Sequence, residues 1–233
     1  MRALLLTLAL AATPATAQDV ELELVLLADA SGSIDQAEID FQRQGYAAAI
    51  TSDEVLGAID NSAYGRIAVT YVEWAANTQQ VAPWTVIDGP GTAQAFADAL
   101  TGPPRLAYGR NAIGGALDDA RRLIDTNDHE GWRKVIDFSG DSANNYSGPS
   151  IADARQAALD AGIVINALAI TCPPPCSGRA RPNLVEDYQR LIIGGPGAFV
   201  VSAEGRSDFA AAVRRKLVLE IGGLTPTTDL AEN

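Results

Sequence analysis

The fold is decided by residues 22–33, Leu22-Glu23-Leu24-Val25-Leu26-Leu27-Ala28-Asp29-Ala30-Ser31-Gly32-Ser33. Residues 22–28 form an apolar run typical of a strand that is buried on both faces. One carboxylate and two hydroxyls follow at alternate positions, Asp29, Ser31 and Ser33, and Gly32 permits the tight turn that would bring them together. Hard oxygen ligands of this kind suit a cation such as Mg2+. The stretch therefore predicts a buried strand that ends in a candidate metal site.

Five further segments have the character of strands. Continuous apolar runs at 67–72, 135–138, 163–170 and 198–201 favour parallel strands covered on both faces. The segment 79–86 contains Pro83, which cannot donate a hydrogen bond to a neighbouring strand and therefore belongs at the edge of a sheet.

Helical patterns lie between these strands. The clearest covers 113–124, where apolar residues recur at spacings of three and four, and others cover 93–100, 151–158 and 209–217. A further helical pattern follows Ser33. Because strands and helices alternate, we predict a doubly wound, mostly parallel α/β sheet flanked by helices.

Two more polar residues are expected at the edge of this sheet where Asp29 lies. In such sheets the binding crevice lies beyond the carboxyl ends of the strands. Asp141 comes directly after the run 135–138 and the pair Ser139-Gly140, so it stands at the tip of a second strand. Asn111 enters the helix at 113–124 and could add an oxygen. The candidate site therefore comprises Asp29, Ser31, Ser33, Asn111 and Asp141.

Composition indicates an exported, single-domain protein. Residues 1–17 have a basic start, a short apolar region and small residues at the end, which predicts a signal peptide. No apolar stretch approaches the ~20 residues that span a bilayer. A net charge of −12 argues against nucleic acid and anionic membrane surfaces as partners. We expect one domain at 18–224 and a flexible tail at 225–233, because no linker or repeat divides the chain.

On these residues the chain resembles the von Willebrand factor A domains, whose metal-ion-dependent adhesion site has an Asp-x-Ser-x-Ser signature. Residues 29–33 match that signature, Asp141 matches the distal aspartate of the family, and Asn111 stands where the family usually has Thr. Residues 69–74 and 135–141 further resemble a secreted bacterial branch described only as a domain of unknown function. With this resemblance we expect six strands in the order 3-2-1-4-5-6, with the Pro83 strand antiparallel at one edge.

The resemblance implies a function as well as a fold. It implies Mg2+, or Mn2+ or Ca2+, held directly by Ser31 and Ser33, with Asp29 and Asp141 ligating directly or through water. An open position on the cation would accept an acidic side chain from a partner protein. The function implied is non-enzymatic adhesion outside the cytoplasm, in the periplasm or beyond the cell. Asn111 in place of Thr implies altered or weakened affinity for the cation.

Plainer interpretations of the same residues remain open. Ser33 with Gln36 matches a helix capping box, Asn111 matches an ordinary helix N-cap, and the two aspartates match turn residues. Two other functions also remain open. One is a metal-assisted hydrolase that uses Asp29, Asp141 and a base such as Glu73, and the other is a structural module whose metal site has decayed. The sequence contains no nucleophile elbow and no phosphate-binding loop.

Four further features of the sequence lead to expectations. Asp137 lies inside a predicted central strand and needs an internal partner, because a buried carboxylate is costly without one. Cys172 and Cys176 bracket three prolines and are expected to form a disulfide in an exported protein. His129, the only histidine, is expected to face solvent in a polar loop. Residues 144–146 follow Asp141 and could contact a partner.

Overall fold

The computed structural model of the protein describes residues 18–171 and 183–226. The expected signal peptide, the predicted disulfide of Cys172 and Cys176, and the end of the tail lie outside the described residues. Six strands form one sheet, namely β1 Gln18–Asp29, β2 Ile67–Trp74, β3 Thr78–Ile87, β4 His129–Gly140, β5 Val164–Thr171 and β6 Val200–Glu204.

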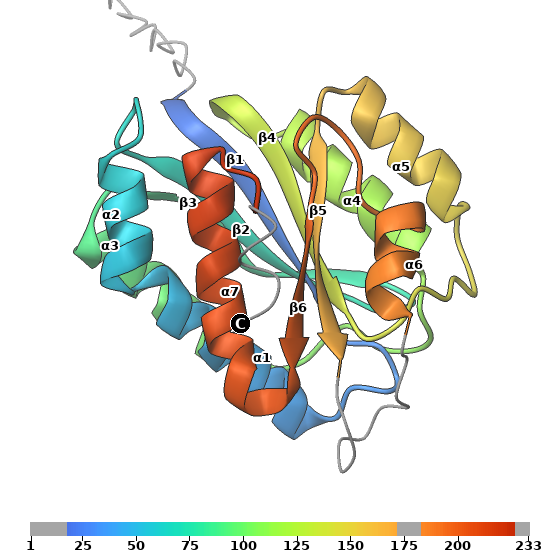
Figure 1. The fold of residues 1–233 in the computed structure, drawn as a ribbon. Helices are drawn as coiled ribbons and strands as arrows, with labels where there is room; N and C mark the ends of the chain where they lie inside the picture. Colours follow the sequence, from blue (N-terminus) through green and yellow to red (C-terminus); the bar gives the residue numbers. More distant parts are fainter. Residues whose placement is uncertain (1–17, 172–182, 227–233) are drawn as a thin grey trace, which may run out of the picture.

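The strand order is β3-β2-β1-β4-β5-β6, as predicted (Figure 1). β1 pairs in parallel with β2 on one side and β4 on the other, and β5 and β6 continue the parallel sheet. Only β3, which contains Pro83, is antiparallel and lies at the edge. Because β1 and β4 are neighbours, the residues that follow their carboxyl ends lie at the same edge of the sheet.

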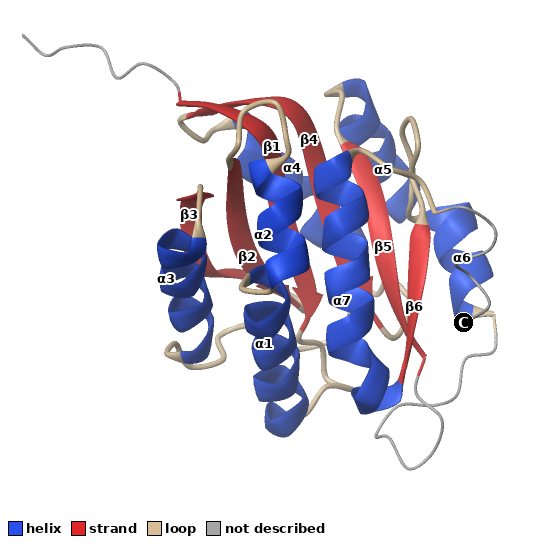
Figure 2. Cartoon of the chain, turned by 60° about the vertical axis from the view of Figure 1, so that its left-hand side comes forward, coloured by secondary structure: helices blue, strands red, loops and turns tan. Residues whose placement is uncertain are grey.

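Helices cover both faces of this sheet (Figure 2). On one face lie α1 Gln36–Ile50, α2 Asp53–Asp60, α3 Pro90–Thr101 and α7 Gly205–Gly222. On the other face lie α4 Ile113–Asp125, α5 Ile151–Asp160 and α6 Leu184–Leu191. The sequence pattern did not predict α2 and α6, which have eight residues each and too few turns to show a clear periodicity.

β1 belongs to both hydrophobic cores of the three-layer structure. Leu24 and Leu26 point into the core beneath α1 and α7, whereas Val25 and Leu27 point into the core beneath α4. This placement confirms the two-sided burial predicted from the apolar run. It also fixes the position of Asp29, which is the last residue of the strand.

The prediction for His129 is wrong. His129 is the first residue of β4, pairs in register with Gln18 of β1, and lies half-buried with its ring 5.9 Å from that of Trp84. The start of β4 could not be predicted from the sequence because residues 127–130 are polar. Backbone pairing with β1, and not an apolar pattern, extends the strand to His129.

Among the described residues, two buried ion pairs join a helix to a strand. The internal partner expected for Asp137 is Lys216 of α7, whose Nζ lies 2.7 Å from Oδ1 of the carboxylate. Arg43 of α1 pairs with Glu73 of β2 at 2.7 Å between Nε and Oε1, and its Nη1 donates to the backbone oxygen of Pro103 at 2.5 Å. Each pair joins a helix to a strand, so these charges are part of the packing between layers.

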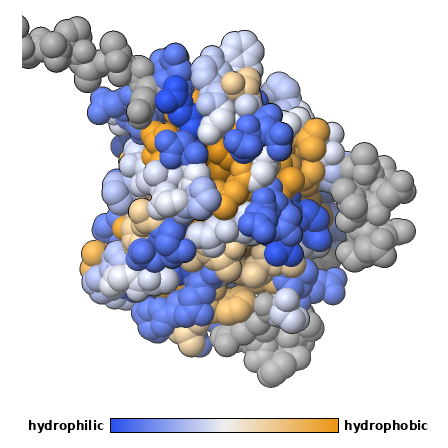
Figure 3. All heavy atoms as spheres, turned by 90° about the vertical axis from the view of Figure 1, so that its left-hand side faces the viewer, coloured by the Kyte–Doolittle hydropathy of each residue, from blue (hydrophilic) through white to orange (hydrophobic). Residues whose placement is uncertain are grey.

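The outer surface of the sandwich is mixed in character. On the side shown in Figure 3, hydrophobic residues gather in small groups among hydrophilic ones. Within the described residues, no helix is long and apolar enough to cross a membrane.

Candidate metal centre

The turn after β1 gathers the first three candidate ligands. The backbone N–H of Ser31 donates to Oδ1 of Asp29 at 2.8 Å, which closes the turn. The Oγ atoms of Ser31 and Ser33 are 3.3 Å apart. Asp29 therefore does act as a turn residue through one oxygen, and its second oxygen, Oδ2, points elsewhere.

That second oxygen faces the end of β4. The backbone N–H of Asp141 lies 3.4 Å from Oδ2 of Asp29, and the hydroxyl of Ser33 lies 3.4 Å from Oδ1 of Asp141. Ser33 and Asp141 are separated by 108 residues in the chain. The fold thus brings four of the five candidates, Asp29, Ser31, Ser33 and Asp141, into one cluster.

A glycine makes this approach possible. A Cβ atom at Gly140 would lie 2.9 Å from Oδ2 of Asp29 and 3.0 Å from both Cζ2 of Trp74 and the hydroxyl oxygen of Tyr188. Any side chain there would push the end of β4 away from Asp29. Gly140 is therefore required for the two aspartates to face one another.

The capping interpretations of Ser33 and Asn111 are wrong. α1 begins after Asp35, whose side chain accepts from the N–H of Glu38 at 2.8 Å, while the Glu38 side chain accepts from the N–H of Asp35 at 3.0 Å. The N-cap of α4 is Ala112, and no side-chain hydrogen bond is made from that position. The capping box that competed with the metal site lies two residues later than the sequence pattern indicated.

Asn111 lies beside the cluster but is not joined to it by a hydrogen bond of its side chain. Its loop contacts the first turn through the N–H of Gly32, which donates to the oxygen of Gly109 at 2.8 Å. The side chain of Asn111 is buried, and within the described residues its Nδ2 atom has no hydrogen-bond partner. A buried amide in this state is costly, so Asn111 is the one candidate whose polar group remains to be satisfied.

Arg105 is a component of the site that the sequence did not predict. Its guanidinium donates to the backbone oxygens of Ala30, of Ser31 at 3.2 Å and of Ile34 at 2.9 Å, and its Nε donates to Ala107 at 2.9 Å. One side chain therefore holds the turn after β1 against the loop before α4. No local motif marks such an arginine, because its partners are backbone atoms far away in the chain.

Aromatic residues border the cluster. The guanidinium carbon of Arg110 lies 3.7 Å from the ring centroid of Tyr146, and Tyr108 and Tyr146 are 55% and 51% exposed. Asn145 has a structural role instead, because its Oδ1 accepts from the N–H of Gly114 at 3.2 Å and its Nδ2 donates to Pro149 at 2.9 Å. Of residues 144–146, Asn144 and Tyr146 are exposed and Asn145 is half-buried.

The charges of the cluster are unbalanced. The pKa of Asp29 is raised from 3.8 to about 7, first by burial and then by the charge of Asp141. The described residues contain no group of three or more His, Cys, Asp or Glu side chains placed to hold a metal ion. The donors are therefore two carboxylates and two hydroxyls, a hard-oxygen set that fits Mg2+ if water completes its coordination. A cation there would stabilise both carboxylates in their ionised form.

These pKa values predict how stability depends on pH when no metal is present. The folded state binds the proton of Asp29 more tightly than the unfolded state, so this contribution is complete below about pH 4 and is lost as the pH rises through about 7. In EDTA, we expect the free energy of unfolding to fall by roughly 2–3 kcal/mol between about pH 5 and about pH 8. Urea unfolding of the wild type and of Asp29→Asn over this pH range isolates the contribution of Asp29, because the variant has no carboxyl group at that position. An equal pH dependence in the two proteins would contradict the prediction.

Glu73 is not available as a base for hydrolysis. Its side chain is buried and paired with Arg43. It also does not join the cluster of Asp29, Ser33 and Asp141 through any hydrogen bond within the described chain. The hydrolase interpretation thus loses the base that the sequence suggested for it.

One family model matches almost all of the described chain. A family model described as "Protein of unknown function (DUF1194)" matches residues 19–225. No curated protein matches the sequence.

Several solved structures share the fold. The pilus adhesin SpaC from Lactobacillus rhamnosus GG has a TM-score of 0.61 at 15% identity, over 87% of this chain and 30% of that one. A von Willebrand factor type A protein from Catenulispora acidiphila has a TM-score of 0.61 at 17% identity, over 87% and 43%. Proximal thread matrix protein 1 from the mussel byssus, solved with a zinc-occupied MIDAS motif, has 0.59 at 16% identity, over 88% and 48%. The chain spans less than half of each of these proteins, and it has the von Willebrand factor A fold.

Proposed function

The chain belongs to the DUF1194 family of proteins of unknown function, and from that premise we propose that it is an exported, non-enzymatic adhesion module that binds a protein partner through a divalent cation. The cation, Mg2+ or a similar ion, is held at the carboxyl edge of the sheet by Asp29, Ser31, Ser33 and Asp141. The observation that carries the proposal is the convergence of these four side chains at the carboxyl ends of two neighbouring strands, β1 and β4.

Each residue has a distinct part in this proposal. Ser31 and Ser33 offer neutral hydroxyl oxygens that bind the ion directly, and Asp29 and Asp141 ligate it directly or through water. Asn111 lies on the adjacent loop and can turn its amide oxygen toward the same region. Because the cluster holds only two carboxylates, a bound divalent ion keeps an affinity for a further anionic oxygen. A carboxylate from the partner meets that requirement.

The names of the similar structures support an adhesive role. They include a pilus adhesin and a byssus matrix protein, the latter with zinc in a MIDAS motif. Export agrees with the signal peptide predicted at 1–17. A hydrolase is the weaker candidate, because its expected base, Glu73, is neutralised by Arg43.

A capture experiment tests the proposed function. Immobilised wild-type protein and Asp29→Asn are each incubated with exported proteins of the source organism in Mg2+ and then eluted with EDTA. We expect at least one protein to elute from the wild type and to be missing from the variant. If EDTA releases the same proteins from both, or releases none, the adhesive function through the cation is wrong.

The position of Arg105 leads to a prediction about the cation site. Its hydrogen bonds fix the backbone of the turn that presents Ser31 and Ser33. Arg105→Gln removes most of these bonds, and loss of such supporting contacts lowers metal affinity by roughly 10–100-fold. Calorimetric titration with Mg2+ measures the change. Arg110→Gln is the matched control, because Arg110 is exposed and contacts Tyr146 instead of the turn. Equal affinities of the two variants for Mg2+ would contradict the role of Arg105.

A further inference from the structure

A second polar cluster lies deep in the core, between the sheet and α7. Lys216 of α7 lies with its Nζ 2.7 Å from Oδ1 of Asp137 on β4. Glu220, one helical turn after Lys216, contacts the same Nζ through Oε1. The side chains of these three residues are at most 1% exposed. An amine and two carboxyl groups are therefore held together where solvent does not reach them.

The surroundings keep this cluster in place. Asn166 of β5 donates through Nδ2 to Oε1 of Glu220 at 3.0 Å and accepts through Oδ1 from the N–H of Phe199 at 3.1 Å. The ring of Phe199 lies 5.8 Å from Nζ of Lys216. The amine is therefore bordered by an aromatic ring and two carboxyl groups, all in the core between the sheet and α7.

From this arrangement we propose that Lys216 and Asp137 condense into an intramolecular isopeptide bond, with Glu220 as the group that carries the proton. The metal cluster takes no part in this reaction. Holding an amine against a carboxyl group in fixed orientation replaces an encounter between two molecules with a step inside one, which lowers the barrier substantially. Burial of an ion pair is costly, and the amide removes both charges.

The reaction balances without any further reactant. Lys216 passes one proton to the carboxylate of Asp137, which leaves a neutral amine and a neutral acid. Nζ then forms a bond to Cγ of Asp137, and the bond between Cγ and the hydroxyl oxygen breaks. Glu220 takes a proton from Nζ and gives its own proton to the departing hydroxyl, which leaves as water. An ammonium and a carboxylate thus become an amide and one water molecule.

The state of Glu220 fits this role. Burial, followed by the charge of Asp137, raises the pKa of Glu220 from 4.5 to about 8. The raised pKa favours the protonated form of this carboxyl group, which can donate its proton to the leaving oxygen. The product bond would tie α7 covalently to the central strand β4.

Mass spectrometry of the reduced, denatured full chain tests the proposal. With the bond, the intact protein is lighter by the mass of one water than the sequence of the purified chain, counted from that chain's own N-terminus. Trypsin then cannot cleave after Lys216, and the peptide 135–155 stays joined to the peptide 216–233. Without the bond, the intact mass equals that of the sequence, and peptides 135–155 and 217–233 appear separately. The second result would overturn the proposal. The experiment uses only the wild-type protein, so its outcome does not depend on whether a variant folds.

Three variants identify the reacting groups. In Asp137→Asn the leaving group is ammonia, so the linked peptides are expected with the loss of ammonia in place of water. Lys216→Arg has no amine that can form the bond, so its intact mass should equal the mass calculated from the sequence of the variant. Glu220→Gln should fold and leave most molecules unlinked, and complete linkage in that variant would overturn the proton transfer by Glu220.

Discussion

Gly114→Ala should destabilise the protein by about 3 kcal/mol or more, because the first turn of α4 has no space for a methyl group. A Cβ atom at Gly114 would lie 2.2 Å from the backbone oxygen of Pro149 and 2.9 Å from that of Ser150. These are backbone atoms of the segment that connects β4 to α5, so relief requires moving that segment. The same segment follows Asp141, and the substitution should therefore weaken Mg2+ binding as well. Urea unfolding measures the loss of stability.

The adjacent glycine is the matched control. A Cβ atom at Gly115 would meet nothing closer than Cβ of Ala112 at 3.8 Å, an ordinary contact. Alanine is the better helix former by about 1 kcal/mol, so Gly115→Ala should leave the protein as stable as the wild type or more so. If Gly114→Ala and Gly115→Ala unfold at the same urea concentration, α4 does not pack against 149–150 as described.

Arg43→Met should cost about 3–5 kcal/mol, because it leaves the carboxylate of Glu73 buried without its counter-charge. Arg43 also donates to the oxygen of Pro103, so the loop after α3 loses a contact in the same variant. Replacing the whole pair, in Arg43→Met with Glu73→Leu, should recover most of that stability. Unfolding free energies of the wild type, both single variants and the double variant measure the coupling.

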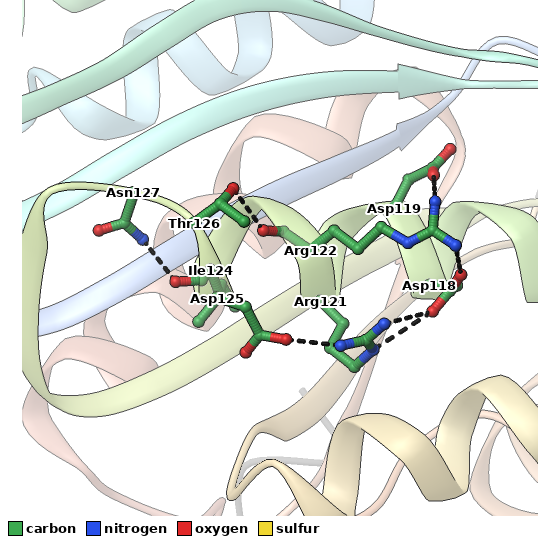
Figure 4. A network of polar contacts seen from close by, with 8 residues as sticks. All are labelled: Asp118, Asp119, Arg121, Arg122, Ile124, Asp125, Thr126 and Asn127. Carbon is green, nitrogen blue, oxygen red and sulfur yellow. Dashed lines mark hydrogen bonds and ion pairs between the residues drawn. The ribbon is translucent and has the colours of Figure 1, made fainter.

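A surface arginine provides the comparison. Arg122 of α4 pairs with Asp118 at 2.6 Å and Asp119 at 3.9 Å, and its side chain is 63% exposed (Figure 4). Ion pairs in such positions contribute up to about 1 kcal/mol, since water solvates the charges when the pair is broken. Arg122→Met should therefore be nearly neutral. A cost for Arg43→Met no larger than that for Arg122→Met would contradict the burial of the Arg43–Glu73 pair.

The strands and the edge position of β3 could be predicted because their signals are local, whereas the order of the strands followed from the resemblance to the von Willebrand factor A domains. Apolar runs mark strands buried on both faces, and Pro83 marks the edge strand. The end of β1 at Asp29 and the tip of β4 before Asp141 also follow from where the apolar runs stop. Given the strand order, the approach of Asp29 to Asp141 follows from parallel strands ending at one edge.

Other parts of the site could not be predicted, because their partners are backbone atoms or residues far away in the chain. Arg105 binds carbonyl oxygens more than 70 residues earlier in the chain, and such bonds leave no pattern in the sequence. Lys216 was not identifiable as the partner of Asp137, since its neighbours on α7 are charged residues of the same kind. The sequence places the cap of α1 at Ser33 because Ser33 and Asp35 both match a capping residue. In the folded protein the hydroxyl of Ser33 faces Asp141, and Asp35 caps the helix.

Thermal unfolding of the full chain in Mg2+, compared with EDTA, tests the central claim most directly. If Asp29, Ser31, Ser33 and Asp141 hold the cation, Mg2+ at about 100 times its dissociation constant stabilises the wild type by about 2.7 kcal/mol, which raises the Tm by about 5–10 °C. In Asp141→Asn the rise should be largely lost at the same Mg2+ concentration. A wild-type Tm that Mg2+ and Mn2+ leave unchanged, or an equal rise in Asp141→Asn, would contradict the metal centre.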